Sequence, residues 1–180
     1  MCGIAGLIHR GRSSNVGEEL QNMLQALKHR GPDSTGYALY ANNDGQNFIL
    51  RFKVGENVGE GSTSVNEDES VYDERKKLVD IKLSELGATV VKEDRLTPYS
   101  YRYEMKYNKD LMEFSKVLES IESVEILSIG KSLELIKDLG DAITVSERYG
   151  LNKVQGTHGI GHARMATESG VDIKSAHPFW

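Results

Sequence analysis

The strictest pattern in this sequence is an alternation of large and polar side chains over residues 99–107. The large side chains recur at every second position, as Tyr99, Tyr101, Tyr103, Met105 and Tyr107. Because successive side chains of a β-strand point to opposite faces of its sheet, this alternation predicts a strand with one buried face. Any fold adopted by this chain must therefore contain a sheet that packs an aromatic face into a core.

Helical periodicity is present as well. Between residues 16 and 27, apolar side chains recur at steps of three and four, which predicts a helix with one apolar face. Asn15, with Glu18 three residues later, is typical of a helix start, and Gly31 is typical of a helix end. We therefore expect this helix to end at Arg30.

The remaining segments include both kinds of element. Apolar patterns predict further strands at residues 3–9, 36–41, 47–54, 88–92, 124–129 and 157–164, and further helices at residues 70–86, 111–121 and 133–139. The turn-like sequence Asn-Asn-Asp-Gly at residues 42–45 predicts a hairpin between strands 36–41 and 47–54. Residues 55–69, rich in Gly, Ser, Asn and acidic residues, predict a loop or boundary. The chain is predicted to be an α+β protein.

Length and charge narrow the class of protein. With 180 residues, of which 38% are hydrophobic, the chain can form a globular domain with a core. Its 22 basic and 27 acidic side chains are interspersed and give a net charge of -5, which disfavours nucleic-acid binding. No apolar run approaches the roughly 18 residues that a membrane span needs, and the N-terminus lacks a basic leader. We therefore expect a cytoplasmic protein without a membrane segment.

The single cysteine, Cys2, directly follows the initiator Met. It cannot form an intramolecular disulfide, so it is a small buried side chain, a chance surface residue or a reactive thiol. Removal of Met1 would give Cys2 a free α-amine, whose pKa of about 7.7–8.0 in reference peptides suits a general base toward the adjacent thiol. The thiolate could then attack an amide, release ammonia and leave a thioester that water hydrolyses.

Three segments accompany this cysteine. They are Cys-Gly-Ile-Ala-Gly at residues 2–6, His-Arg-Gly-Pro-Asp-Ser at residues 29–34 and Gly-His-Ala-Arg-Met-Ala-Thr-Glu-Ser at residues 161–169. In this order they resemble the class II glutamine amidotransferases, a family of enzymes with an N-terminal nucleophile. The resemblance covers about residues 2–54 and 155–180.

The resemblance implies a fold and a reaction. The fold is the αββα sandwich of N-terminal-nucleophile hydrolases, truncated at its C-terminal side and carrying a small α+β insertion at about residues 55–154. The reaction is hydrolysis of L-glutamine to glutamate and ammonia through a thioester on Cys2, without a cofactor. A chain that retains Met1 is expected to be inactive, because the α-amine would be blocked.

The resemblance also implies a partner. Arg-Met-Ala-Thr-Glu-Ser, together with Ser-Ile-Gly-Lys at residues 128–131, is most similar to the family branch associated with glutamate synthase. A synthase-like partner is therefore expected to receive the ammonia. In the family, an Asn-Gly oxyanion segment and a later acidic residue complete the pocket, and we expect another chain or a continuation of this one to supply them. Alone, the truncated chain is expected to be a poor glutaminase.

Side chains near the C-terminal end would bind the substrate if the resemblance holds. Arg164 would hold the α-carboxylate of glutamine through two parallel hydrogen bonds. Thr167 would donate its hydroxyl to the same carboxylate, unless it only caps the local backbone. His177, in a His-Pro-Phe segment, would lie beside the glutamine pocket, although His-Pro is also an ordinary way to leave a strand.

Arg30, Gly31 and Asp33 are expected to shape the wall beside the nucleophile, as structural rather than catalytic residues. His158 and His162 have the four-residue spacing of a helical zinc site. In a strand, however, four residues span about 13 Å, which is too far for both rings to reach one ion. No metal site is therefore predicted.

Two other functions remain compatible with the sequence. A non-catalytic glutamine-binding or assembly subunit would keep Arg164 and lack the chemistry of Cys2. A hydrolase with an N-terminal cysteine could also act on other amides, although Arg164 within its motif favours an amino-acid substrate. The insertion could bind a partner or a regulator, or be a passive elaboration.

Overall fold

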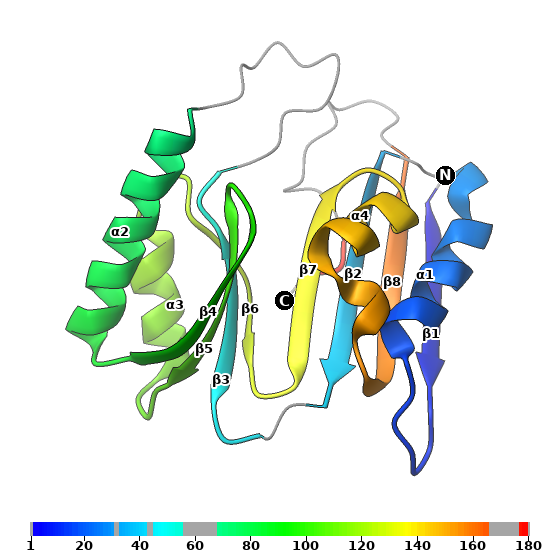
Figure 1. Cartoon of the computed structure of the whole chain (residues 1–180), viewed down its shortest axis with the longest axis horizontal. Helices are drawn as coiled ribbons and strands as arrows, with labels where there is room; N and C mark the ends of the chain where they lie inside the picture. The colour runs from blue at the N-terminus through cyan, green and yellow to red at the C-terminus, as the bar shows by residue number, and fades with distance from the viewer. Residues whose placement is uncertain (1, 31–32, 43–44, 56–67, 166–176, 180) are drawn as a thin grey trace. The chain divides into compact units, whose positions relative to one another are not determined.

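The computed structural model describes residues 2–30, 33–42, 45–55, 68–165 and 177–179. The chain forms two compact units. The described residues of the first unit fall within Met1–Asn42 and Ser132–Trp180, and those of the second within Asn43–Val58 and Ser64–Lys131. In the part of the chain that the structure describes, each unit has one four-stranded antiparallel sheet and two α-helices (Figure 1). The prediction of an α+β protein is confirmed.

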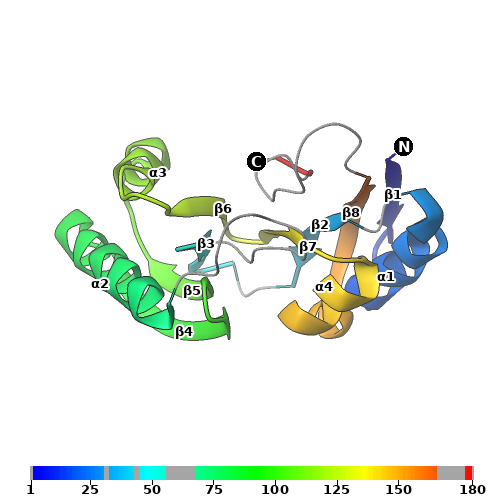
Figure 2. The same ribbon diagram turned by 90° about the horizontal axis from the view of Figure 1, so that it is seen from above.

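The first unit is built on a sheet with the strand order β1-β8-β2-β7. Its elements are β1 (Gly3–Ile8), α1 (Val16–Ala26), the 3-10 helix η1 (Lys28–Arg30), β2 (Ser34–Ala41), β7 (Leu133–Leu139), α4 (Ala142–Tyr149), the 3-10 helix η2 (Leu151–Lys153) and β8 (Gly156–Arg164). Figure 2 shows α1 and α4 on the same side of this sheet. We call this side the helix face, and the opposite side, which carries Ile4, Ile160 and His162, the second face.

Helix α1 begins where the sequence predicted. The side chain of Asn15 accepts a hydrogen bond of 3.3 Å from the backbone N–H of Glu18, which satisfies one of the free donors in the first turn. The regular helix ends at Ala26 rather than at Arg30. Beyond it the chain tightens into η1, where the Arg30 N–H donates to the Leu27 carbonyl at 2.7 Å, because 3-10 bonds commonly close a helix end.

Glycines in β8 let α1 lie close to the sheet. Leu20 and Leu24 of α1 are fully buried. A Cβ placed on Gly161 would lie 2.5 Å from Leu24 Cδ1, and one on Gly159 would lie 3.4 Å from Leu20 Cδ2. These positions of β8 therefore point toward the helix face, and the side chains between them point toward the second face.

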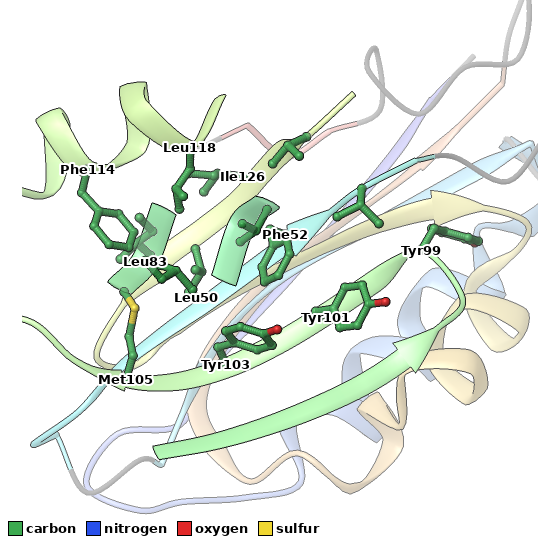
Figure 3. Close-up of a cluster of buried hydrophobic side chains, with 14 of the residues drawn as sticks. Leu50, Phe52, Leu83, Tyr99, Tyr101, Tyr103, Met105, Phe114, Leu118 and Ile126 are labelled. Atoms are coloured by element: carbon green, nitrogen blue, oxygen red, sulfur yellow. The ribbon is translucent and has the colours of Figure 1, made fainter. Parts of the chain in front are cut away.

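The second unit is built on a sheet with the strand order β4-β5-β3-β6. Its elements are β3 (Phe48–Lys53), α2 (Glu69–Leu86), β4 (Thr89–Thr97), β5 (Ser100–Lys106), α3 (Leu111–Glu119) and β6 (Glu125–Gly130). Strand β5 confirms the predicted alternation, since Tyr101 and Tyr103 are buried with Phe52 at ring-centroid distances of 5.3 and 5.1 Å (Figure 3). Leu83 of α2 and Phe114 of α3 belong to the same apolar cluster, so both helices cover this face.

The hairpin predicted between residues 36–41 and 47–54 is wrong. Strand β2 pairs with β7 and β8, whereas β3 pairs with β5 and β6. The two strands therefore belong to different sheets. The composition of residues 42–45 describes the local backbone and carries no information about the partner of either strand.

The helix predicted at residues 133–139 is also wrong, because this segment is strand β7. With Ile136, its leucines include the steps of three and four that a helix shows. The strand is buried along almost its whole length, including the charged residues Glu134, Lys137 and Asp138. Without an exposed polar face, the segment lacked the period-two pattern that identifies a strand. Helix α4, which follows it, is absent from the prediction.

The other predicted strands and helices all overlap elements of the structure. Among the residues that the structure describes, no helix combines the length and the apolar character needed to cross a membrane.

Candidate active site

One end of the first sheet brings together residues that are far apart in the sequence. Strand β1 begins directly after Cys2, β2 begins directly after Asp33, and β8 ends at Arg164. Gly3 pairs with Ala163, and β8 is antiparallel to both β1 and β2. The starts of β1 and β2 therefore lie at the same end of the sheet as the C-terminal end of β8.

Cys2 and Arg164 occupy facing positions at this end of the sheet. Both lie one residue beyond the Gly3–Ala163 pair, on neighbouring strands. A Cβ on Gly3 would lie 3.2 Å from Leu27 Cβ, so Gly3 points toward the helix face. Continuing the alternation of β1 places Cys2 on the second face, which Arg164 shares. The Cys2 side chain is exposed and is a free thiol.

Backbone hydrogen bonds of Asp33 hold the strand ends together at this end of the sheet. The Asp33 carbonyl accepts a hydrogen bond of 3.0 Å from the Gly140 N–H, directly after β7. The next residue, Asp141, caps α4 and forms an ion pair of 2.7 Å with Lys28 of η1. The bond to Lys28, with those to Thr144, lowers the pKa of Asp141 to about 2. These contacts tie the ends of the strands to α4 and to η1.

Arg30 also lies near this end of the sheet, since a Cβ on Gly3 would lie 3.4 Å from Arg30 Cβ. The predicted site residues Gly31 and Thr167 lie outside the described residues. The structure therefore brings Cys2, Arg30, Asp33 and Arg164 to one end of the first sheet.

His177 lies over the second face. A Cβ on Gly36 of β2 would lie 1.9 Å from the His177 carbonyl oxygen, so only glycine at this position lets the backbone of the His-Pro-Phe segment approach so closely. The His177 ring centroid lies 4.9 Å from that of His162 and 4.5 Å from that of Phe179. Together with Ile4, these residues line a cavity of about 280 Å³.

His162 is a candidate residue that the sequence analysis considered only as a zinc ligand. Only 9% of its surface is exposed, and its Nδ1 atom has no hydrogen-bond partner among the residues that the structure describes. Burial, followed by the electrostatic effects of His177 and Arg164, lowers its pKa. Its position two residues before Arg164 on the same strand face was the signal that could have found it.

His158 occupies a different environment on the same strand. Its ring stacks on Tyr40 at a centroid distance of 3.9 Å, and its Nδ1 atom lies 2.9 Å from the hydroxyl of Thr157. Among the described residues, no group of three or more His, Cys, Asp or Glu side chains is arranged to hold a metal ion.

The chain is similar to known proteins over most of its length. Residues 1–48 match the family model for a glutamine amidotransferase domain. A Methanothermobacter thermautotrophicus protein named "Putative glutamine amidotransferase" is 34% identical over 99% of this chain and 56% of its own length. The glutamine amidotransferase-like protein GlxB of Rhizobium meliloti is 31% identical over 99% of this chain and 54% of its own length.

A shorter similarity extends to a third protein. The glutamine–fructose-6-phosphate aminotransferase (isomerizing) of Methanococcus maripaludis is 34% identical over 42% of this chain and 13% of its own length. The chain thus spans about half the length of the first two relatives, 56% and 54%.

Proposed function

We propose that this chain is part of a class II glutamine amidotransferase with Cys2 as its N-terminal nucleophile. The observation that carries the proposal is the facing arrangement of Cys2 and Arg164 at one edge of the first sheet. Residues 1–48, which include Cys2, match a glutamine amidotransferase domain. A thiol and a guanidinium on neighbouring strands can engage the two ends of one glutamine molecule.

The proposed reaction begins with removal of Met1, which frees the α-amine of Cys2 to accept the thiol proton. The thiolate attacks the side-chain amide carbon of L-glutamine. The carbon–nitrogen bond then breaks, the nitrogen takes up the proton and leaves as ammonia, and a thioester forms on Cys2. Water hydrolyses this thioester to glutamate and restores the thiol.

Substrate orientation follows from charge. Arg164 would bind the α-carboxylate through two parallel hydrogen bonds, which directs the amide end toward Cys2. Thr167 would donate to the same carboxylate, and His177 would form the adjoining wall. Arg30, Gly31 and Asp33 would form the wall beside Cys2 and hold the strand ends in place without touching the reacting atoms.

The proposal extends to the organisation of the whole protein. Residues 2–54 and 155–180 would belong to a truncated αββα domain of the N-terminal-nucleophile type, interrupted by an insertion at about residues 55–154. The ammonia would pass to a glutamate-synthase-like partner in the cytoplasm. Another chain or segment would complete the pocket.

A covalent probe tests the central claim. The complete protein is incubated with a diazo-ketone analogue of glutamine, and the modified residue is located by mass spectrometry. We expect one label, on a Cys2 that carries a free amino terminus, together with release of glutamate from glutamine. The variant Cys2→Ser is the control and should take up no label. A processed protein that binds glutamine but neither labels nor hydrolyses would instead be a non-catalytic glutamine-binding subunit.

A further inference from the structure

Strand β4 forms one edge of the second sheet. Among the strands that the structure describes it pairs with β5 alone, and it is the outermost strand in the order β4-β5-β3-β6 (Figure 1). The residues from Thr89 to Glu93 are all exposed. An edge strand presents a row of backbone N–H and C=O groups that another extended chain can pair with. The edge of β4 that faces away from β5 can therefore accept a further strand.

A groove of about 360 Å³ lies between β4 and helix α2. Its apolar lining comes from Leu83 of α2, from Ala88 and from Val90 of β4, and the carboxylates of Asp80 and Glu93 also line it. When a peptide adds to a sheet edge, backbone hydrogen bonds supply affinity and pockets for alternate side chains supply specificity. The edge of β4 offers the first of these and the groove offers the second.

A bulge in β4 turns two of its side chains toward this groove. The register shifts after Val90, so that Val90 lies opposite Met105 and Glu93 lies opposite Tyr103. Met105 and Tyr103 are fully buried in the apolar cluster that α2 covers. Because opposed residues of an antiparallel pair lie on the same face, Val90 and Glu93 both face α2. An added strand would meet one apolar position and one acidic position there.

The groove has an excess of negative charge. Lys76 Nζ lies 2.8 Å from Asp80 Oδ2 and 3.0 Å from Glu93 Oε2, so one ammonium group serves two carboxylates. Among the described residues, the groove lining itself contains acidic but no basic side chains. A basic side chain on the bound segment would balance this charge, whereas an acidic one would be repelled.

The sequence of β4 disfavours pairing with a second copy of itself. Two antiparallel edge strands related by a two-fold axis would place one residue opposite its own copy. Residues 92–95 in the middle of β4 are Lys-Glu-Asp-Arg, so every register centred on them sets two identical charges against each other. Like charges directly opposite are destabilising. The occupant that fits is therefore a segment of a different sequence.

We propose that β4 and α2 form a docking site for an extended segment of a partner protein. The segment adds to the free edge of β4 as a further strand, with an apolar side chain beside Val90 and a basic side chain beside Glu93. This inference goes beyond the reaction proposed for Cys2 and does not depend on it, because every residue of the site belongs to the second unit.

Peptide binding to the complete protein tests the inference. The probe is a short fluorescein-labelled peptide of threonine and serine that carries arginine and valine two positions apart, and its binding is measured by fluorescence anisotropy. A second peptide, with glutamate in place of arginine, should bind at least about tenfold more weakly. Addition of the arginine peptide should also slow the amide hydrogen exchange of β4, because a new strand protects its free edge.

The matched substitutions are Val90→Lys and Val91→Lys. They put the same charge on neighbouring exposed valines of β4, of which only Val90 lines the groove. Val90→Lys should weaken binding of the arginine peptide at least about tenfold, whereas Val91→Lys should change it by less than about twofold. If Val90→Lys does not fold, Glu93→Gln must reduce the preference for the arginine peptide over the glutamate peptide.

Several results would overturn the inference. One is a protein that binds neither peptide, or binds both equally. Another is binding that leaves hydrogen exchange in β4 unchanged, which would exclude strand addition. Equal weakening by Val90→Lys and Val91→Lys would show that charge on the strand, and not the groove, governs binding. None of these results would bear on labelling of Cys2, so the proposed function stands or fails separately.

Discussion

The backbone N–H of Asp33 donates a hydrogen bond of 3.2 Å to the carbonyl oxygen of Arg164. Through its own carbonyl, Asp33 also accepts from Gly140 after β7. The main chain of Arg164 is thus held at the sheet edge independently of its side chain. Changes to the guanidinium should therefore alter the proposed site without removing this support.

Replacing Arg164 is expected to weaken glutamine binding. Arg164→Ala removes one partner of a charge-assisted pair and should cost about 2 kcal/mol or more. Arg164→Lys should bind glutamine with an affinity between those of the wild type and Arg164→Ala, because an ammonium lacks the planar fork that binds a carboxylate at two points. Competition by glutamine against the labelling of Cys2 measures the affinity. Arg10→Ala, at an exposed arginine of the same unit, is the control. Unchanged competition in Arg164→Ala would remove this residue from the site.

Gly17→Ala should destabilise the first unit, although alanine is the better helix former by roughly 1 kcal/mol. A Cβ at position 17 would lie 1.7 Å from the carbonyl oxygen of Leu151 in η2, so backbone must move. We expect a net loss of about 1–3 kcal/mol in urea unfolding. Asn22→Ala, on the exposed side of the same helix, should be neutral or slightly stabilising. A stabilised Gly17→Ala would contradict the observed closeness of α1 and η2.

Tyr103→Phe should destabilise the second unit. The buried Tyr103 hydroxyl donates to Asp80 Oδ1 at 2.8 Å, and burial raises the pKa of this phenol. Loss of the bond should cost about 1 kcal/mol in urea unfolding. The control Tyr107→Phe removes an exposed hydroxyl whose contact with the Asp110 carbonyl is 3.4 Å, and should change stability by less than about 0.5 kcal/mol. Equal effects of the two substitutions would mean that the bond to Asp80 adds nothing.

Asp141 should make the stability of the first unit depend on pH. Its pKa is lowered from 3.8 to about 2 by Lys28 and then by Thr144. A lowered folded-state pKa means stabilisation that is complete above about pH 4 and lost as the pH falls toward 2.

The variant Asp141→Ala should therefore lose about 0.5–2 kcal/mol at pH 7, the usual cost of removing an N-cap, and much less near pH 2. Urea unfolding at both pH values measures the difference. A destabilisation that is the same at both would show that the carboxylate charge is not what stabilises α4.

Several features were determined by the sequence alone. The alternating tyrosines of β5 and the Asn15 cap of α1 depend on interactions within a few residues, so local patterns predicted them. The motifs around Cys2 and Arg164 likewise identified the candidate residues, because those residue types carry the chemistry wherever the chain places them.

Only the tertiary structure decided which strands meet. The partners of β2 lie about a hundred residues away in sequence, and no local signal distinguishes them from a neighbouring strand such as β3. The burial of the charged residue Lys137 on β7 is likewise set by the tertiary structure, and the apolar spacing of this segment alone had suggested a helix. The burial of His162, whose Nδ1 atom has no partner among the described residues, arises only once β1 and β8 pair, because burial and register are properties of the assembled sheet and not of any single segment.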